Sequence, residues 1–542
     1  MSALEDFLRA AGKGESVWLG DVRESLAAET GHVEAVIRLT LPKGEERDYV
    51  FPLVRPETEK ERCLLCRALR AQLFNLLSAC SASSLQLYLP EQADAALWTL
   101  AEEALEGLTE PGYGKALRVA DRLCAGVGAP PYHSGLLPLS AREPLPTPTY
   151  RAAPPLAPRL RKRAALGERG LRCGLDVGGT DIKLAIARDG ALLLTEEFDW
   201  DPSRFQRAEE LMEPIQAFLF RGLEKACPGE TARPDSLGLS FPDVVIRDRI
   251  LGGETPKTRG MRDADPAAYE SEFRKLAGLK EKLETMCRPG TRVRVLNDGS
   301  MAAFSAALEL ACAGEDEAIS RGVFAHSLGT DLGSGWLDED GTVPELPLEL
   351  YDLLIDLGSD PKAALSAEDL RSTRNENSGL PGARRYLGQA AAYRLAWELN
   401  PRLLEDFAEE KDGVLRIRQE PEDLRKPCLE HLMRLAEMGE PAARETFRQI
   451  GRHLGQISRE IEYILAPQTP RRFLFGRFVR HPGCFRLLRE GCAEVMPQLE
   501  LCPADEGLAY SPLMRALASR KDGAVARFGQ AVGAIYYGIK EE

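Results

Sequence analysis

The chain has 542 residues, of which 44% are hydrophobic and 28% are charged, and its formal net charge at pH 7 is −14. This length exceeds what one hydrophobic core organises, so we expect several domains, and the composition excludes a largely disordered chain. The acidic balance disfavours nucleic acids and anionic membranes as partners, because both repel negative charge.

The N-terminal sequence and the cysteines indicate a cytoplasmic protein. No basic segment followed by an apolar core opens the sequence, and no uncharged apolar run of about 18 residues, as a membrane span needs, comes later. The 12 cysteines are scattered, which predicts reduced and buried thiols. Cys63 and Cys66 have zinc-like spacing, but no second pair or histidine stands at ligand distance.

Residues 1–135 are expected to form an α+β accessory domain of unknown role. Segments 33–42 and 47–54 alternate like the two strands of a hairpin, and segments 57–80 and 91–108 have apolar residues at helical spacing. Two amphipathic helices are therefore predicted to cover a hairpin.

Repeated prolines between 144 and 169 predict an extended linker over residues 136–170, because proline lacks the amide that regular pairing needs. From residue 171 onward, strands and helices alternate with short glycine turns. This pattern predicts an α/β architecture that continues to the C-terminus.

A glycine turn interrupts two apolar runs in the segment LRCGLDVGGTDIKLAIARDG, residues 171–190. Outward-pointing amides in such a turn cradle phosphate oxygens, and a carboxylate at the strand end can hold a hydrated metal ion. An ordinary hairpin with an aspartate cap is the alternative for one isolated turn. A second turn of the same design, in segment 322–341, favours a pair of phosphate-binding hairpins.

Four further segments follow in chain order: 237–261, 293–309 with an Asn-Asp pair, 347–357, and 464–488. Together with the two turns, they resemble the ROK family (repressors, open reading frames and sugar kinases) of the actin-like superfamily. The resemblance implies an α/β, duplicated actin-like (ribonuclease H-like) two-lobe fold with a central cleft. The small lobe would span residues 171–301 and the large lobe residues 302–542.

The resemblance also implies ATP-dependent phosphorylation of a hexose or amino-sugar hydroxyl, with Asp298 as the general base. Sugar binding falls to Asn297, Asp243 and, on the weakest match, Glu349. Asp176 would hold Mg²⁺ through water. The residues implied for the nucleotide phosphates are Asp176, Gly178, Gly179, Thr180, Lys183, Gly329, Thr330 and Gly476. Without the resemblance, Asp298 could be a helix N-cap, Glu349 a helix-surface acid and Lys183 a solvent-facing strand residue.

Departures from the family pattern leave two other functions open. Asp352 stands where many relatives have a histidine, and the segment that follows has no cysteines, so no zinc site is expected. Asp181 and Asp331 add negative charge to the two turns, and Arg477 replaces a glycine. These changes favour a non-catalytic sugar- or nucleotide-binding sensor as the alternative.

A ROK-type transcriptional regulator is disfavoured as a third function. Residues 1–150 hold 15 basic and 21 acidic side chains, and their expected strand hairpin does not look like a winged helix. A sugar and a nucleotide are the expected partners, and a homodimer is left open.

Overall fold

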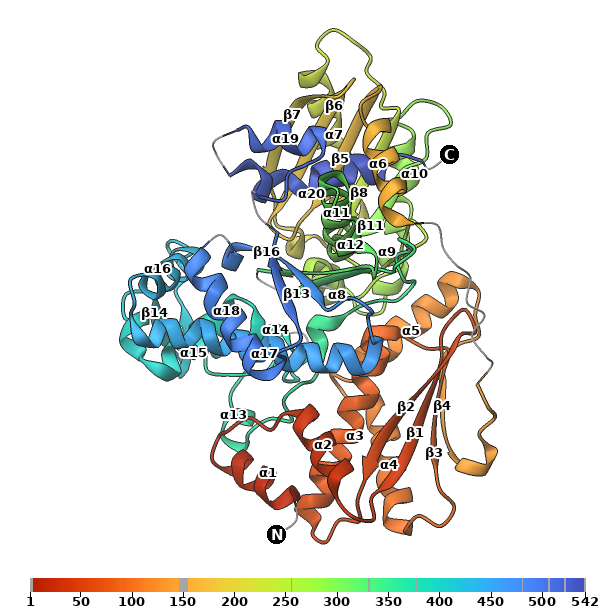
Figure 1. The fold of residues 1–542 in the computed structure, drawn as a ribbon, viewed down its shortest axis with the longest axis vertical. Helices are drawn as coiled ribbons and strands as arrows, with labels where there is room; N and C mark the ends of the chain where they lie inside the picture. Colours follow the sequence, from red (N-terminus) through yellow and green to blue (C-terminus); the bar gives the residue numbers. More distant parts are fainter. Residues whose placement is uncertain are drawn as a thin grey trace.

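The fold comes from a computed structural model that describes residues 3–145, 155–254, 256–329, 332–375, 378–479, 481–504, 507–520 and 523–540 (Figure 1). Three larger sheets organise these residues: a four-stranded sheet near the N-terminus, a five-stranded sheet and a second four-stranded sheet. The expected mixed α/β architecture is confirmed.

The N-terminal unit is built on the strand order β2-β1-β3-β4. The predicted hairpin is formed by β1 (Val33–Thr40) and β2 (Glu46–Leu53), and β3 (Ser84–Leu89) and β4 (His133–Pro138) extend it. Because β4 runs to Pro138, the unit continues past the expected boundary at residue 135. Its helices are α1 (Ala3–Gly12), α2 (Leu19–Ala28), α3 (Glu59–Cys80), α4 (Ala95–Glu106) and α5 (Gly114–Val127).

Helix α3 is the one helix among the described residues with the length and apolar composition of a membrane span, yet 83% of its most apolar window is buried. It packs between the N-terminal sheet and a later part of the chain. Asn75 exchanges two hydrogen bonds with the backbone of Leu354, at 2.9 and 2.7 Å. This burial is typical of a core helix.

The first lobe is a five-stranded sheet with the order β11-β8-β5-β6-β7, lying at the top of Figure 1. Strands β5 (Leu171–Val177), β6 (Asp181–Arg188) and β7 (Ala191–Asp199) form an antiparallel meander, and β8 (Ser236–Phe241) and β11 (Arg294–Asn297) run parallel to β5. The elements around it are α7 (Ala208–Ala226), β9 (Val245–Ile246), β10 (Arg249–Ile250), α8 (Arg259–Ala264), α9 (Tyr269–Leu276) and α10 (Leu279–Glu284).

The second lobe repeats this strand order over four strands, β13-β12-β16-β17. A hairpin of β12 (Val323–Leu328) and β13 (Leu332–Leu337) is followed by β16 (Arg471–Gly476) and β17 (Glu500–Pro503), which run parallel to β12. Its other elements are α11 (Asp298–Ala313), α12 (Asp316–Ile319), α13 (Asp360–Ala363), α14 (Arg384–Leu387), α15 (Gln389–Leu399), β14 (Ala408–Lys411), β15 (Val414–Ile417), α16 (Arg425–Glu437), α17 (Pro441–Leu465) and α18 (Pro482–Val495). The arrangement is consistent with an actin-like two-lobe fold.

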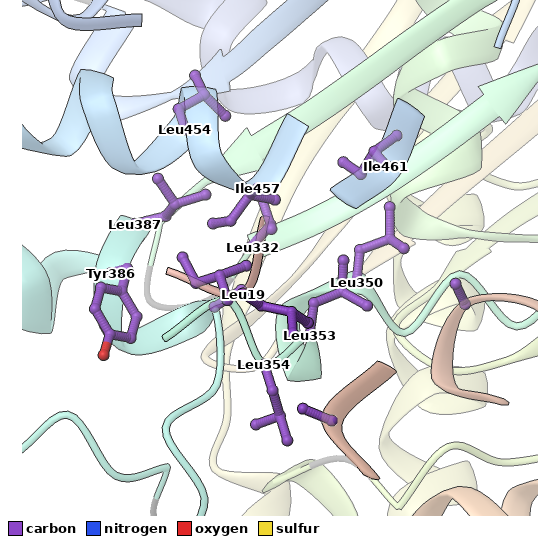
Figure 2. Close-up of a cluster of buried hydrophobic side chains, with 14 of the residues drawn as sticks. Leu19, Leu332, Leu350, Leu353, Leu354, Tyr386, Leu387, Leu454, Ile457 and Ile461 are labelled. Carbon is purple, nitrogen blue, oxygen red and sulfur yellow. The ribbon is translucent and has the colours of Figure 1, made fainter. Parts of the chain in front are cut away.

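The N-terminal unit and the second lobe share one hydrophobic core. Figure 2 shows Leu19 of α2 among Leu332 of β13, Leu350 and Leu353, and Ile457 of α17. The expectation of an accessory domain on an extended tether therefore needs correction, because its apolar surface is packed against the lobe.

The linker prediction is wrong for residues 156–166, which form helix α6 (Leu156–Leu166). Pro155 is the N-cap and Pro158 lies in the first turn, where helical amides have no intrahelical partner and proline costs little. Leu156, Leu160 and Ala164 are buried in the core that contains α11. The rest of the proline-rich stretch, 146–154, lies outside the described residues.

The C-terminal helices α19 (Pro512–Ala518) and α20 (Ala524–Tyr537) return to the first lobe, where they lie beside β5–β7 in Figure 1. A Cβ atom on Gly238 of β8 would lie 1.8 Å from the carbonyl oxygen of Ala534, so α20 can approach the sheet only over a glycine. The expected boundary at 301/302 also falls inside α11. The two lobes are therefore not the contiguous segments that the sequence suggests.

Candidate functional site

A cavity of about 220 Å³ lies between the two lobes. Asp176 at the end of β5, Lys183 on β6 and Gly476 at the end of β16 all line it. Helix α11 adds Ser305 and Glu309, and α20 adds Gln530. Three of the residues expected to bind nucleotide therefore meet at one cavity, although they come from strands of two different sheets.

Asp176 is a buried carboxyl group in a negatively charged environment. Ser240 donates a hydrogen bond to its Oδ1 at 2.8 Å. Burial raises the pKa of Asp176 to about 6; Lys183 opposes the shift, and Asp298 and Asp181 add to it. A divalent cation would relieve this concentration of negative charge, so the donor set fits a hydrated Mg²⁺.

Lys183 faces the cavity and is not a solvent-facing alternate of its strand. Its ammonium group pairs with Asp181, which also accepts a hydrogen bond from the Thr180 hydroxyl at 3.2 Å. The negative charge that Asp181 adds to the turn is therefore partly neutralised inside the turn itself.

The first turn is closed by its own hydrogen bonds. The Gly178 amide donates to the carbonyl of Asp181 at 2.7 Å, and Trp200 donates to the carbonyls of Thr180 at 3.0 Å and Gly178 at 3.1 Å. The Gly178 amide is therefore already used by a hairpin bond, and its predicted phosphate contact stays a prediction. Gly179 and Thr180 are exposed at the tip of the turn.

In the second turn, Thr330 and Asp331 lie outside the described residues. The Gly329 carbonyl accepts a hydrogen bond from the amide of Gln389, the first residue of α15, at 3.0 Å. Gly476 pairs with Leu328 across β12 and β16 and has a φ of 107°. A Cβ there would lie 2.2 Å from the Leu328 carbonyl oxygen, which explains the glycine.

Asp298 is the first residue of α11, and Asn297 is the helix N-cap. The Asn297 Oδ1 accepts hydrogen bonds from the amides of Gly299 at 2.9 Å and Ser300 at 3.3 Å. The alternative reading of Asp298 as the cap is therefore wrong. The Asp298 side chain is half-buried and close enough to Asp176 for the two charges to interact, and its carbonyl accepts from the Gln530 side chain.

The residues expected to bind sugar lie close to one another. The Asn297 Nδ2 donates to the carbonyl of Asp243 at 2.9 Å, and the buried Asp243 carboxylate accepts from the amides of Val244 and Gly253. A Cβ on Gly253 would lie 2.6 Å from Oε1 of Glu349. Burial raises the pKa of Asp243. The Asn297 and Asp243 side chains therefore help to fix the loop between residues 243 and 253 through backbone hydrogen bonds.

Glu349 is buried and is not a helix-surface acid; it directly precedes the short helix η5 (Leu350–Asp352). Its partner is Lys115 of α5, whose ammonium nitrogen lies 3.1 Å from Glu349 Oε2, 2.5 Å from Asp352 Oδ2 and 2.6 Å from the Tyr351 hydroxyl. The sequence analysis did not identify Lys115. No local signal marks it, since its partners follow more than 230 residues later.

The charged side chains around Lys115 shift one another's pKa values. Burial raises the pKa of Glu349 to about 7, against the opposing effect of Lys115. Burial alone would lower the pKa of Lys115, but Asp352 and Glu349 outweigh it and raise that pKa, so the ammonium group stays protonated.

Lys257 is a second cation that the sequence analysis passed over. It lies in the short helix η4 (Pro256–Thr258), and its Cε would be 3.3 Å from a Cβ on Gly179. It also interacts electrostatically with Asp243. Lys257 therefore stands between the first turn and the loop of Asp243. Its position within segment 237–261 was the one available signal.

Within the described ranges, no group of three or more His, Cys, Asp and Glu side chains could hold a metal ion. All 12 cysteines are free; Cys63 is exposed and Cys66 is buried on α3.

No protein-family model and no curated protein matches the chain. Its structural neighbours include ROK family sugar kinases and a ROK regulator. The ROK family glucokinase of Streptomyces griseus, in complex with glucose and AMPPNP, is 18% identical over 68% of this chain and 98% of its own, with a TM-score of 0.41.

The ROK hexokinase of Thermus thermophilus is 17% identical over 68% of this chain and 97% of its own, with a TM-score of 0.39. A ROK family transcriptional regulator, a homologue of the Escherichia coli Mlc protein, is 14% identical over 68% and 79%, with a TM-score of 0.39.

Proposed function

We propose that the chain is an ATP-dependent carbohydrate kinase that phosphorylates a hydroxyl of a hexose or amino sugar. One observation carries the proposal: Asp176, Lys183 and Gly476 line one interlobe cavity, and Asp298 interacts electrostatically with Asp176. The residues proposed to bind phosphate and the candidate base thus lie near each other, which in-line phosphoryl transfer requires.

Each residue of the site would have its own role in phosphoryl transfer. Asp298, whose Oδ1 accepts a hydrogen bond from the Gly299 amide at 2.8 Å, would accept the proton of the acceptor hydroxyl as the new bond forms. Lys183 and Lys257 would neutralise phosphate charge, while Asp176 would hold Mg²⁺ through water. Magnesium supplies further charge neutralisation when it is bound.

We also propose that the two sheets are copies of one actin-like unit, since their shared order places a hairpin beside two parallel strands in each. The first copy would be completed by α20 and the second by the helices between β13 and β16. The second copy lacks a strand equivalent to β7 among the described residues.

A coupled ADP-release screen over hexoses and amino sugars tests the activity. We expect at least one sugar to stimulate release, and Asp298→Asn to reduce the stimulated rate by about 10²- to 10⁴-fold, the usual contribution of a general base. Asp360→Asn, at the first position of α13, is the control and should leave the rate unchanged.

A non-catalytic sensor is the second candidate, and the Lys115 ion pairs favour it because they occupy the carboxylate of Glu349, one of the residues expected to bind sugar. The two functions separate in one comparison. Nucleotide binding without sugar-stimulated ADP release, in the wild type and in Lys115→Met alike, would support the sensor and contradict the kinase.

A further inference from the structure

A second cavity, of about 480 Å³, shares no lining residue with the cavity that contains Asp176. Both lobes contribute to its wall, through the β9–β10 hairpin and β11 of the first lobe and residues 341–345 of the second. Helix α6 and the C-terminal end of α20 complete it. We call it the basic cavity, because five of its described lining residues are basic: Arg159, Arg163, Arg247, Arg294 and Lys540.

Two of these cations are packed against aromatic rings. Arg163 is only 7% exposed, and its guanidinium carbon lies 5.3 Å from the centre of the Phe304 ring and 6.0 Å from that of Tyr537. The guanidinium carbon of Arg294 lies 4.8 Å from the same Tyr537 ring. Two positive charges are therefore held near one buried ring, which costs free energy unless negative charge is close by.

The acidic side chains of the basic cavity do not balance its cations. Both carboxylates of the described lining already face a cation: Asp248 accepts from Arg294 at 3.0 and 3.1 Å, and Glu345 accepts from Arg247 at 2.9 Å. Glu345 also pairs with Lys43 of the N-terminal unit. Five basic and two acidic residues leave a formal excess of three positive charges in this wall, although the whole chain has a net charge of −14.

Several donors of the basic cavity are available to a ligand. Arg294 bonds through Nε and Nη2, and Arg247 bonds through Nε alone, so each guanidinium keeps Nη donors that no described residue uses. Lys540 is exposed and makes no ion pair within the described ranges. Guanidinium groups with free Nη donors suit the oxygens of a phosphate or carboxylate group.

The β9–β10 hairpin is strained where it reaches the basic cavity. Arg247 and Asp248 form its tip, with φ of 51° and 62°, a region that favours glycine. Asp248 also accepts a hydrogen bond from the Val295 amide at 2.9 Å, which fixes the tip against β11. Strained non-glycine residues of this kind are typical of functional sites, and here the strain places a cation at the cavity.

We propose that the basic cavity binds the phosphate group of a small phosphorylated metabolite. A phosphate monoester carries nearly two negative charges at pH 7 and has three strong acceptor oxygens, which match the excess charge and the free donors. The volume of the cavity also leaves room for an organic group beside the phosphate. Because the two cavities share no lining residue, this site goes beyond the proposed function.

Calorimetric titration of the full-length protein with glycerol 3-phosphate tests the site, with glycerol and inorganic phosphate titrated in parallel. We expect glycerol 3-phosphate to bind saturably at one site per chain, more tightly than inorganic phosphate, and glycerol not to bind. Arg247→Gln and Lys540→Gln change exposed side chains, so both variants should fold, and each should weaken binding about tenfold.

Arg161→Gln is the matched control. It removes one positive charge from the same helix α6, but Arg161 pairs with Asp316 and does not line the basic cavity. Its affinity for glycerol 3-phosphate should equal that of the wild type. An equal loss of affinity in Arg161→Gln, Arg247→Gln and Lys540→Gln would show only a long-range charge effect and would overturn the site.

Three other results would also contradict the proposal. The wild type would show no saturable binding of glycerol 3-phosphate, or inorganic phosphate would bind as tightly, which would leave the cavity a site for free phosphate. In the third case, Lys183→Gln would abolish binding while Arg247→Gln and Lys540→Gln would not, which would place the phosphate at the nucleotide cavity. Sugar-stimulated ADP release enters none of these readouts, so failure of the kinase proposal would leave this test unaffected.

Discussion

Asp176 shows how a buried carboxylate costs stability. Because its pKa in the folded protein is about 6, above the ordinary value of 3.8, the folded state disfavours the ionised form. The cost is absent below the unfolded pKa, grows as pH rises between the two values and is fully present above pH 6. In the proposed function, a bound cation would offset this cost.

Asp176→Asn should stabilise the protein at pH 8 by about 2–3 kcal/mol, the cost of a shift of roughly two pKa units, and give little change at pH 4. Its Mg²⁺-dependent nucleotide binding should be lost. Denaturant unfolding at both pH values and calorimetric titration with Mg-ATP would check this, and a variant that is less stable at pH 8 would contradict it.

Wild-type nucleotide binding should also weaken as pH falls below about 6, because protonation of Asp176 removes the charge that holds the cation. A titration series between pH 5 and pH 8 measures this dependence. Binding that does not change across this range would show that the ionisation of Asp176 is not used.

At the scale of elements, α20 joins the two parts of the site. It packs on β5 and β8 through glycines, and its Gln530 side chain donates to the backbone of Asp298. The position of the candidate base thus depends on a helix more than 200 residues later in the chain.

Gly238→Ala should displace α20 and lower stability by several kcal/mol, about 3 or more, since the new methyl group would overlap the backbone of Ala534. Gly529→Ala lies on α20 itself, where a Cβ meets nothing nearer than 3.8 Å, and should be neutral or stabilising by up to about 1 kcal/mol. Melting temperatures of the two variants would test this packing. Equal melting temperatures would contradict it.

At the scale of the whole molecule, the N-terminal unit is part of the second lobe's core. Figure 2 shows Leu19 within the cluster of β13, η5 and α17. Removing residues 1–145 would expose these apolar side chains together with the partners of α3.

We therefore expect a fragment of residues 155–542 to aggregate or to bind the dye ANS, although it holds both lobe sheets. Light scattering and ANS fluorescence, compared with the full chain, measure this. A monomeric fragment with a cooperative melting transition would show that the N-terminal unit is an independent domain.

Local patterns in the sequence predicted the local structure well. The hairpin of β1 and β2, helices α3 and α4, and the Gly-Thr turn after β5 follow from alternation, helical spacing and glycine chemistry. The meeting of Asp176, Lys183 and Gly476 at one cavity was implied by family resemblance and is what the structure shows.

What the sequence could not reveal depends on contacts between distant residues. Lys115 has the local features of any amphipathic-helix lysine, and its role appears only when α5 lies beside Glu349 and Asp352. Helix α6 was not predicted because repeated prolines disfavour regular structure. In this helix the prolines stand at the N-cap and in the first turn, where they are tolerated. The Gly178 amide was expected to bind phosphate, yet the hairpin uses it.

The most direct test of the nucleotide site is a crystal structure of the full chain with Mg²⁺ and AMPPNP. We predict that the β- and γ-phosphates lie beside Lys183 and the exposed Gly179–Thr180 tip, with Mg²⁺ next to Asp176 and the γ-phosphate facing Asp298. A nucleotide bound outside the cavity between the two lobes, or with its γ-phosphate directed away from Asp298, would contradict the proposed function.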